Sequence, residues 1–391
     1  MREKRHLYGL FPWFLILYEF AVNLSNDMYV PSLTLISAAF GVPNNVINLT
    51  MTSWFVGAAL PQLWVGPLSD RMGRRPVLFT GGALFLLTTL ICATARSFWP
   101  LFVGRFFQGT AVSSLLVAGY ATVHDHYDDD HAVHILAWLG AAAILAPMIG
   151  PTLGAFLLLA GPWQLIFWII LVIAGAGLFG LWPTMPETVV PMRVHDRTVT
   201  IYKLIFRNRL FTLTSLTLAL GYAGLVAWLA GSLFLLVGDF EVTPQIFGLI
   251  QVPVFVSYFL GAKVIKRLLG PWVRRHAIPI GISIAFLSSL GQVFLILIHA
   301  RTIPTLVIPI SVYALGFGMA AAPLTRSAIA SSLQPRGSVT AAFFLYLMAV
   351  SALGSLAVTL VYDHTTLSVV EVIAGFISVS FVLNIFRHYA S

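Results

Sequence analysis

The sequence predicts an all-α integral membrane protein with twelve membrane-spanning helices in two six-helix halves. Hydrophobic residues make up 59% of its 391 residues and charged residues only 9%, whereas a soluble domain carries roughly 25% charged residues. Twelve apolar stretches are close in length to the roughly 20 residues that a helix needs to cross a bilayer. The one extended polar stretch lies at the midpoint of the chain, which divides the stretches into two sets of six.

The apolar stretches define the predicted spans. In the first half they cover residues 8–30, 46–68, 77–95, 98–123, 133–160 and 163–182. In the second half they cover residues 210–236, 245–267, 276–299, 303–325, 338–361 and 366–387. We therefore expect an N-terminal bundle (1–183), a cytoplasmic linker (184–209) and a C-terminal bundle (210–391). No stretch is left for a soluble catalytic domain, and no nucleophile–base pair stands out, so an enzyme is not expected.

The basic residues gather on one side of the predicted membrane. That side holds 19 of the 22 Lys and Arg residues, whereas Arg96 and Arg301 lie opposite and Arg105 lies within a span. The 19 are Arg2, Lys4, Arg5, Arg71, Arg74, Arg75, Arg193, Arg197, Lys203, Arg207, Arg209, Lys263, Lys266, Arg267, Arg274, Arg275, Arg326, Arg336 and Arg387. The positive-inside rule makes this side cytoplasmic, with both termini on it.

The partners follow from the same composition. The net charge of +8 is explained by topology and requires no nucleic acid. The single cysteine, Cys92, excludes an intramolecular disulfide and a cysteine-based metal site. We expect a monomer in the lipid bilayer with a small-molecule substrate, no cofactor, and protons as the coupling ion.

Several motifs along the chain resemble those of the major facilitator superfamily. The segment GPLSDRMGRRP (66–76) resembles its loop motif after the second helix, LFVGRFFQG (101–109) its fourth-helix motif, and APMIGPTLGA (146–155) the fifth-helix motif of its proton-driven exporters. NDMYVP (26–31) resembles the first-helix signature of the twelve-helix drug/proton antiporters, and LYEF (17–20) with it resembles the MdfA-type multidrug transporters. The resemblance implies the major facilitator fold in a bacterial inner membrane.

Two carboxylates lie within the first predicted span. Glu19 and Asp27 are eight residues apart, which places them about 12 Å apart along a helix and roughly 80° around it. Asn23 and Asn26 lie between them and can hydrogen-bond each carboxyl in either protonation state. An ionised group in a bilayer costs at least about 2.5–3.5 kcal/mol, and such groups mark functional sites. We expect an exchangeable site that a proton or a cationic substrate neutralises; the alternative is a carboxyl held by hydrogen bonds for packing.

Arg105 is the one basic residue within a span and away from its ends. We expect it to sense the protonation of the first-helix acids, and the resemblance implies that this position couples protons to transport. The alternative is a static salt bridge. In the fifth span, Pro147 and Pro151 favour a kink, while Gly150 and Gly154 permit close helix contact. That helix is expected to seal one side of the central cavity, although an ordinary packing kink would give the same pattern.

The loop motif after the second span predicts a conformational latch. We expect Asp70 to lie against a helix N-terminus and Arg74 to pair with an acid such as Asp125, in a cluster that latches the cytoplasmic side and breaks when the carrier opens inward. The alternative is that the basic residues only set topology. The latch residues are Gly66, Asp70, Arg71, Gly73, Arg74, Arg75 and Asp125. The neighbouring run HDHYDDDHAVH (124–134) is interpreted as a solvated charged loop rather than a metal site.

The substrate cavity is expected to be apolar and aromatic with a few polar groups. Candidates to line it, besides the two asparagines, are Met51, Trp54, Met148, Trp228, Gln251 and Tyr258. Aromatic faces favour lipophilic cations. The sequence therefore predicts a proton-coupled multidrug efflux antiporter of the kind that confers antibiotic resistance. The alternatives are an exporter of an endogenous metabolite, such as a siderophore, sugar or amino-acid derivative, and, from other classes, a lipid-modifying enzyme or a channel.

Overall fold

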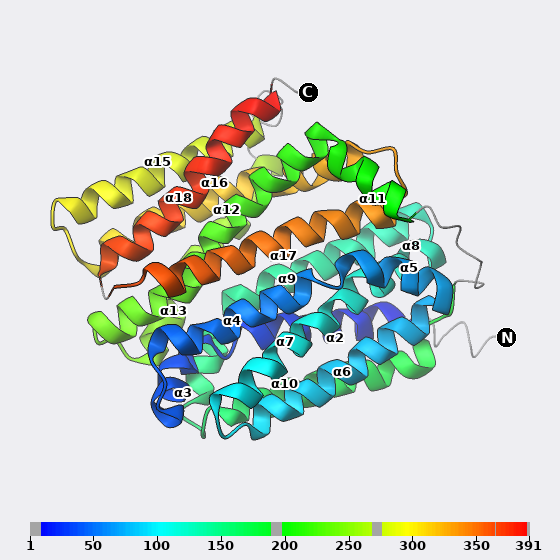
Figure 1. Cartoon of the computed structure of the whole chain (residues 1–391), viewed down its shortest axis with the longest axis horizontal. Helices are drawn as coiled ribbons and strands as arrows, with labels where there is room; N and C mark the ends of the chain where they lie inside the picture. The colour runs from blue at the N-terminus through cyan, green and yellow to red at the C-terminus, as the bar shows by residue number, and fades with distance from the viewer. Residues whose placement is uncertain (1–8, 189–197, 268–275, 364, 389–391) are drawn as a thin grey trace.

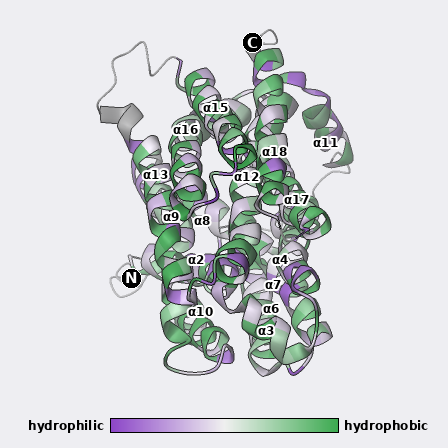
Figure 2. Ribbon diagram, turned by 90° about the vertical axis from the view of Figure 1, so that its left-hand side faces the viewer, coloured by the Kyte–Doolittle hydropathy of each residue, from purple (hydrophilic) through white to green (hydrophobic). Residues whose placement is uncertain are grey.

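The computed structural model describes residues 9–188, 198–267, 276–363 and 365–388. Helices run along the long axis of the molecule (Figure 1), and no strand occurs in the described residues. Hydrophobic residues extend along the lengths of these helices (Figure 2). The predicted all-α membrane architecture is confirmed. Part of the predicted linker and seven of the predicted cytoplasmic basic residues lie outside the described residues: Arg2, Lys4, Arg5, Arg193, Arg197, Arg274 and Arg275.

The helices of the first half follow the predicted spans within a few residues. They are α2 (Phe11–Asp27), α4 (Asn44–Ala59) with α5 (Gln62–Met72), α6 (Arg74–Thr94), α7 (Phe98–Ser114) continuing through the π-helical turn η2 (Leu115–Gly119) into α8 (Tyr120–His126), α9 (Asp129–Leu157) and α10 (Gln164–Thr184). After α2 the chain forms the 3₁₀ turn η1 (Val30–Ser32) and the short helix α3 (Leu33–Phe40).

The second half repeats this arrangement. It begins with the amphipathic helix α11 (Thr198–Arg207), followed by α12 (Arg209–Leu233) with the π-helical turn η3 (Phe234–Asp239), α13 (Pro244–Arg267), α15 (Ala277–Leu297), α16 (Ile303–Ala330), α17 (Arg336–Val361) and α18 (Thr366–His388). Across the halves, α4 packs on α17 and α9 packs on α13. We call the end of the bundle where α5, α8, α10 and α16 finish the basic end.

Ten helices among the described residues are long and apolar enough to cross a membrane. The other two predicted spans are shorter than expected. Helix α2 has 17 residues, and the second span is divided into α4 and α5 around Leu60 and Pro61. Proline has no backbone N–H to donate and its ring crowds the preceding turn, which ends a regular helix.

Close contacts between helices depend on glycine at equivalent places in the two halves. A Cβ added to Gly57 of α4 would overlap the carbonyl oxygen of Phe106, and one added to Gly109 of α7 would overlap that of Trp54. Helices α13 and α16 repeat this reciprocal pair, with Gly261 against Leu315 and Gly318 against Tyr258. The backbones of each pair therefore touch without side chains between them.

Replacing Gly57 with valine is expected to lower the thermal unfolding midpoint of the detergent-solubilised protein, measured by tryptophan fluorescence. The added side chain must push α4 away from α7, and overpacking of this kind typically destabilises by about 1–3 kcal/mol. Gly291→Val is the matched control, because a Cβ at this helical glycine meets nothing within 4 Å. Equal midpoints for the two variants would contradict the close contact between α4 and α7.

Candidate functional site

A central cavity of about 280 Å³ lies between the two halves of the chain. Its wall is mainly apolar and aromatic, and it includes Trp54, Tyr120, Tyr222, Phe255, Tyr258, Phe317, Phe343 and Phe344. Glu19 contributes the one carboxylate among the lining residues, and Asn23 lies one turn further along α2. The cavity therefore suits a lipophilic ligand and presents it with one acidic side chain.

Glu19 is almost fully buried, with 1% of its surface exposed. The Tyr120 hydroxyl donates a hydrogen bond of 2.7 Å to its Oε1 atom, whereas Oε2 has no hydrogen-bond partner within the described residues. The Asn23 side chain donates to the backbone carbonyl of Glu19 at 2.9 Å, so it supports the helix rather than the carboxyl. One carboxylate oxygen is therefore held in place by Tyr120 and the other is left for a proton or a ligand.

Asp27 lies two turns along α2 from Glu19 and is not itself one of the residues that line the cavity. The Asn26 amide nitrogen donates to Asp27 Oδ1 at 3.1 Å. The amide oxygen of the same Asn26 accepts a hydrogen bond of 3.1 Å from Arg105 Nη2. The Asn26 amide thus bridges the buried carboxylate and the buried guanidinium, a position distinct from the substrate contact predicted for it.

Arg105 is fully buried on α7. Its Nη1 atom donates to the Ser25 carbonyl at 2.8 Å and to Gln108 Oε1 at 2.6 Å, and its guanidinium lies 4.2 Å from the ring centre of Tyr29. Within the described residues no carboxylate lies within 4.0 Å of it. The alternative of a direct salt bridge is therefore wrong for this conformation, because neutral acceptors and an aromatic face surround the charge.

The fifth-span motif (146–155) lies in the part of α9 that contacts the end of α2 on one side and α13 on the other. A Cβ on Gly150 would come within 3.0 Å of Asp27 Cβ, and one on Gly154 would overlap the Met28 carbonyl oxygen. On the opposite side of α9, the Thr152 hydroxyl donates to the Gly248 carbonyl of α13 at 2.8 Å. The two glycines thus allow α9 to touch the end of α2, next to the buried Asp27. Pro147 lines the cavity, and Pro147 and Pro151 both lie within a continuous α9.

The predicted cavity residues separate into two groups. Trp54 and Tyr258 line the cavity, as does Asn23. Trp228 and Gln251 are instead fully buried against each other, with Trp228 Nε1 donating to Gln251 Oε1 at 2.9 Å. Met51 and Met148 also lie outside the set of lining residues. Two residues of this site were not predicted from the sequence. Tyr120 donates to Glu19, and Gln108 accepts from Arg105; the position of Gln108 one turn after Arg105 on the same helix could have indicated its role.

At the basic end, a cluster of charged residues joins α5, α6, α8 and the segment after α10. Arg74 contacts Asp70 at 2.5 Å and Asp125 at 3.3 Å. The backbone N–H groups of Arg74 and Arg75 each donate at 3.0 Å to the Glu187 carboxylate. The acid at the N-terminus of α6 is therefore Glu187 rather than the predicted Asp70. Asp70, one turn earlier in the chain, instead pairs with the guanidinium of Arg74. Gly73 turns the chain between α5 and α6 with φ +100°.

The remaining latch residues are less closely connected. A Cβ on Gly66 would have ordinary contact, 3.7 Å, with the Tyr202 hydroxyl oxygen, and Arg71 is exposed. The acidic run of residues 124–134 forms the end of α8 and the start of α9 rather than a loop. Asp128 caps α9 by accepting from the backbone N–H of His131 at 2.9 Å, and this hydrogen bond holds the pKa of Asp128 below its ordinary value.

Comparison with known proteins decides the family. Residues 15–358 match the family described as "Major Facilitator Superfamily". The chain belongs to the major facilitator superfamily. It is accordingly a multi-pass membrane transporter for a small molecule, not an enzyme.

Three relatives of this chain within the major facilitator superfamily share the same description. Proteins described as "Multidrug transporter MdfA" from Yersinia pestis bv. Antiqua (strain Angola) and Edwardsiella ictaluri (strain 93-146) are 33% and 32% identical to this chain over 356 residues. Each alignment covers 88% of this chain and 85% of the relative. The protein of the same description from Escherichia coli O6:H1 (strain CFT073) is 29% identical over 350 residues. The predicted superfamily and MdfA-type resemblance are confirmed.

A solved structure agrees on the fold of this superfamily member. The human organic anion transporter MFSD10 (TETRAN) superposes with a TM-score of 0.67 at 18% sequence identity. The match covers 97% of this chain and 99% of that one. At this identity the likeness establishes the major facilitator fold, which confirms the predicted fold class.

Proposed function

We propose that this transporter is a proton-coupled antiporter that exports small lipophilic, often cationic, drugs from a bacterial cell by alternating access. The observation that carries the proposal is the unpartnered Glu19 Oε2 in the wall of an aromatic cavity. A lipophilic cation in the cavity would neutralise this carboxylate and stack on the surrounding rings. The description of the relatives as multidrug transporters supports the same substrate class.

The proton is assigned to the pair of acids on α2. Glu19 faces the cavity, so substrate and proton can compete for it directly. Asp27 is connected to Arg105 through the Asn26 amide, so its ionisation alters the electrostatic environment of the guanidinium. A buried carboxyl in contact with protein rather than water is stable when protonated and needs a cation when ionised. Exchange at these two acids would link proton release to substrate binding.

The two ends of the bundle support alternating access. Away from the basic end, α4 and α17 are joined by hydrogen bonds from Asn48 to Thr359 and between Thr52 and Ser355, both at 2.9 Å. The contact of Thr152 with Gly248 adds α9 and α13 to this seam. The cavity lies on the other side of the seam, toward the basic end. If the basic end is cytoplasmic, together with both termini, the seam closes the cavity of the monomer to the outside, while the cluster around Arg74 is formed at the cytoplasmic end.

The proposal is tested by uptake of a fluorescent lipophilic cation into proteoliposomes with an acidic lumen. Native uptake is expected to collapse when a protonophore is added. In Glu19→Gln, cation uptake should fall at least about tenfold, corresponding to about 1.4 kcal/mol of lost charge interaction, while uptake of a neutral lipophilic substrate should fall less. Glu371→Gln is the matched control, because Glu371 is an exposed carboxylate on another span.

The outcomes distinguish the substrate classes. If native, folded protein moves none of the lipophilic compounds, the proposal of drug export is wrong, and an endogenous metabolite becomes the substrate to test. If Glu19→Gln transports cations and neutral compounds as the native protein does, the assignment of Glu19 as the cation site is wrong.

A further inference from the structure

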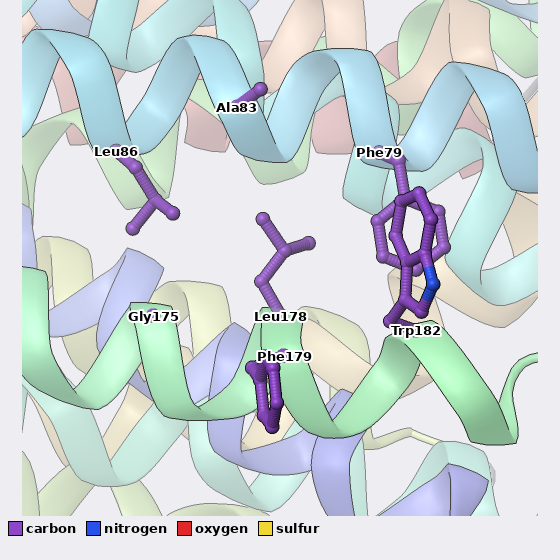
Figure 3. A pocket seen from close by; sticks show the side chains of 7 residues that line it. All are labelled: Phe79, Ala83, Leu86, Gly175, Leu178, Phe179 and Trp182. Atoms are coloured by element: carbon purple, nitrogen blue, oxygen red, sulfur yellow. The ribbon is translucent and has the colours of Figure 1, made fainter.

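A second hollow, which we call the outer groove, lies between α6 and α10 and apart from the central cavity (Figure 3). Its volume is about 450 Å³. Figure 3 shows Phe79 and Leu86 on α6 facing Leu178 and Trp182 on α10, with Phe79 and Trp182 together at one end and Ala83 on α6 between Phe79 and Leu86. The outer groove is wholly apolar in its lining side chains apart from the indole N–H of Trp182.

The outer groove faces the bilayer. Both of its helices are candidate membrane spans, and two of its lining side chains are largely exposed, Phe179 at 82% and Trp182 at 62%. An apolar hollow does not hold water, because a water molecule there would lack hydrogen-bond partners. Within a membrane, the molecule available to fill it is a lipid acyl chain.

A cation lies at the end of the outer groove nearest the basic end. The guanidinium carbon of Arg75 is 5.7 Å from the ring centre of Phe79 and 5.6 Å from that of Trp182, and Arg75 Nη2 donates to the Trp182 carbonyl at 2.6 Å. Arg75 lies in the first turn of α6 and Trp182 in the last turn of α10, the depth at which aromatic and basic side chains meet lipid headgroups. Glu187 bonds the backbone N–H of Arg75, and within the described residues no carboxylate pairs with its guanidinium.

We propose that the outer groove binds an anionic glycerophospholipid, with one acyl chain between α6 and α10 and the phosphate at Arg75. The rings of Phe79 and Trp182 and the Trp182 carbonyl fix the guanidinium at the groove end, so the remaining N–H donors can bind a phosphate oxygen. The hydrocarbon and the charge are recognised together, which distinguishes this site from the rest of the lipid-facing surface. The site is separate from the central cavity, and its existence does not depend on the transported substrate.

Quenching of Trp182 fluorescence by lipids with brominated acyl chains tests this proposal. The full-length protein is reconstituted in phosphatidylcholine bilayers, and brominated phosphatidylglycerol or brominated phosphatidylcholine replaces part of the lipid. The Trp182 signal is the difference between the native protein and Trp182→Phe. The same difference with Trp99→Phe provides a comparison, because Trp99 is similarly exposed, at 68%, but lies outside the groove.

In the native protein, half-quenching of Trp182 is expected at about fivefold less phosphatidylglycerol than phosphatidylcholine, the preference that one basic side chain confers at a membrane surface. The Trp99 signal should show no such preference. Arg75→Gln should reduce the ratio for Trp182 to about one, whereas Arg207→Gln, which removes an exposed charge from the same end, should leave it unchanged.

Filling the outer groove tests the acyl-chain part of the proposal. In Gly175→Leu, the added side chain enters the groove without meeting backbone, since the nearest atom to the new Cβ is Leu86 Cδ2 at 4.0 Å. The preference should be lost in this variant and in Ala83→Leu, which fills the groove from the other wall, and kept in Gly291→Leu. A native ratio near one, or a preference that survives both groove-filling substitutions, would overturn the proposal.

Discussion

Replacing Asp27 with asparagine is expected to abolish proton-driven uptake of a lipophilic cation into proteoliposomes. Asparagine retains the shape of the side chain and its hydrogen bond with Asn26, but it cannot ionise at any pH used in the assay. Substrate should still bind in the central cavity, because Asp27 does not line it. We therefore expect binding within about threefold of native, a difference of less than 1 kcal/mol, with uptake reduced to the level of empty liposomes.

Two comparisons make the Asp27 result specific. Asp363→Asn removes an exposed acid from the loop before α18 and should leave uptake intact. Lumenal pH should drive uptake in the native protein and have no effect in Asp27→Asn. Uptake by Asp27→Asn at the native rate and with the native pH dependence would remove Asp27 from the coupling site and leave Glu19 as the acid that exchanges protons.

Replacing Arg105 with lysine should cause the second large effect. The guanidinium donates at once to the Ser25 carbonyl, Gln108 and Asn26, and a lysine ammonium lacks the planar fork that reaches all three. Hydrogen bonds to a charged group contribute about 1.5–3 kcal/mol each. We expect uptake to fall at least about tenfold for the loss of one such bond, together with a lower thermal unfolding midpoint. Arg301→Lys, at an exposed turn, should change neither.

A further variant separates stability from coupling at Arg105. Asn26→Leu removes the bridge to Asp27 but leaves the hydrogen bonds of Arg105 to Ser25 and Gln108. It should uncouple uptake from lumenal pH with a smaller change in midpoint than Arg105→Lys. If Asn26→Leu keeps full proton dependence, the amide bridge has no part in coupling, and the effect of Arg105→Lys is structural.

The spans were predictable from the sequence because a run of about 20 apolar residues is a local property. Most observed helix limits lie within a few residues of the predicted ones. The short helices α3 and α11 were not predicted, since neither is long enough to cross a bilayer and their positions depend on packing against α4 and α17. The second span was predicted as one continuous helix, but a single residue, Pro61, interrupts the run and divides it into α4 and α5.

The site was predictable where polarity within a span was decisive and less so where orientation mattered. Glu19 and Arg105 stood out because charged groups are expensive in a bilayer. Hydropathy does not indicate which face of a helix turns inward, so Tyr120 and Phe317 were not identified although both line the cavity. Trp228 was assigned to the cavity as an aromatic residue and Gln251 as a polar residue within a span; they instead hydrogen-bond to each other. Nothing in the sequence brought Glu187 to the start of α6.

The seam between α4 and α17 joins the halves through uncharged groups: Asn48 with Thr359 and with the Ser355 carbonyl, and Thr52 with the Ser355 side chain. Water can replace a neutral hydrogen bond with little net change in free energy, so separating this seam exposes no unpaired ion. Ionic strength should accordingly have little influence on how readily that end opens. The charged cluster around Arg74 at the other end is subject to screening by salt. The two ends of the carrier therefore respond to different properties of the solutions they face, one to hydration and the other to dissolved ions.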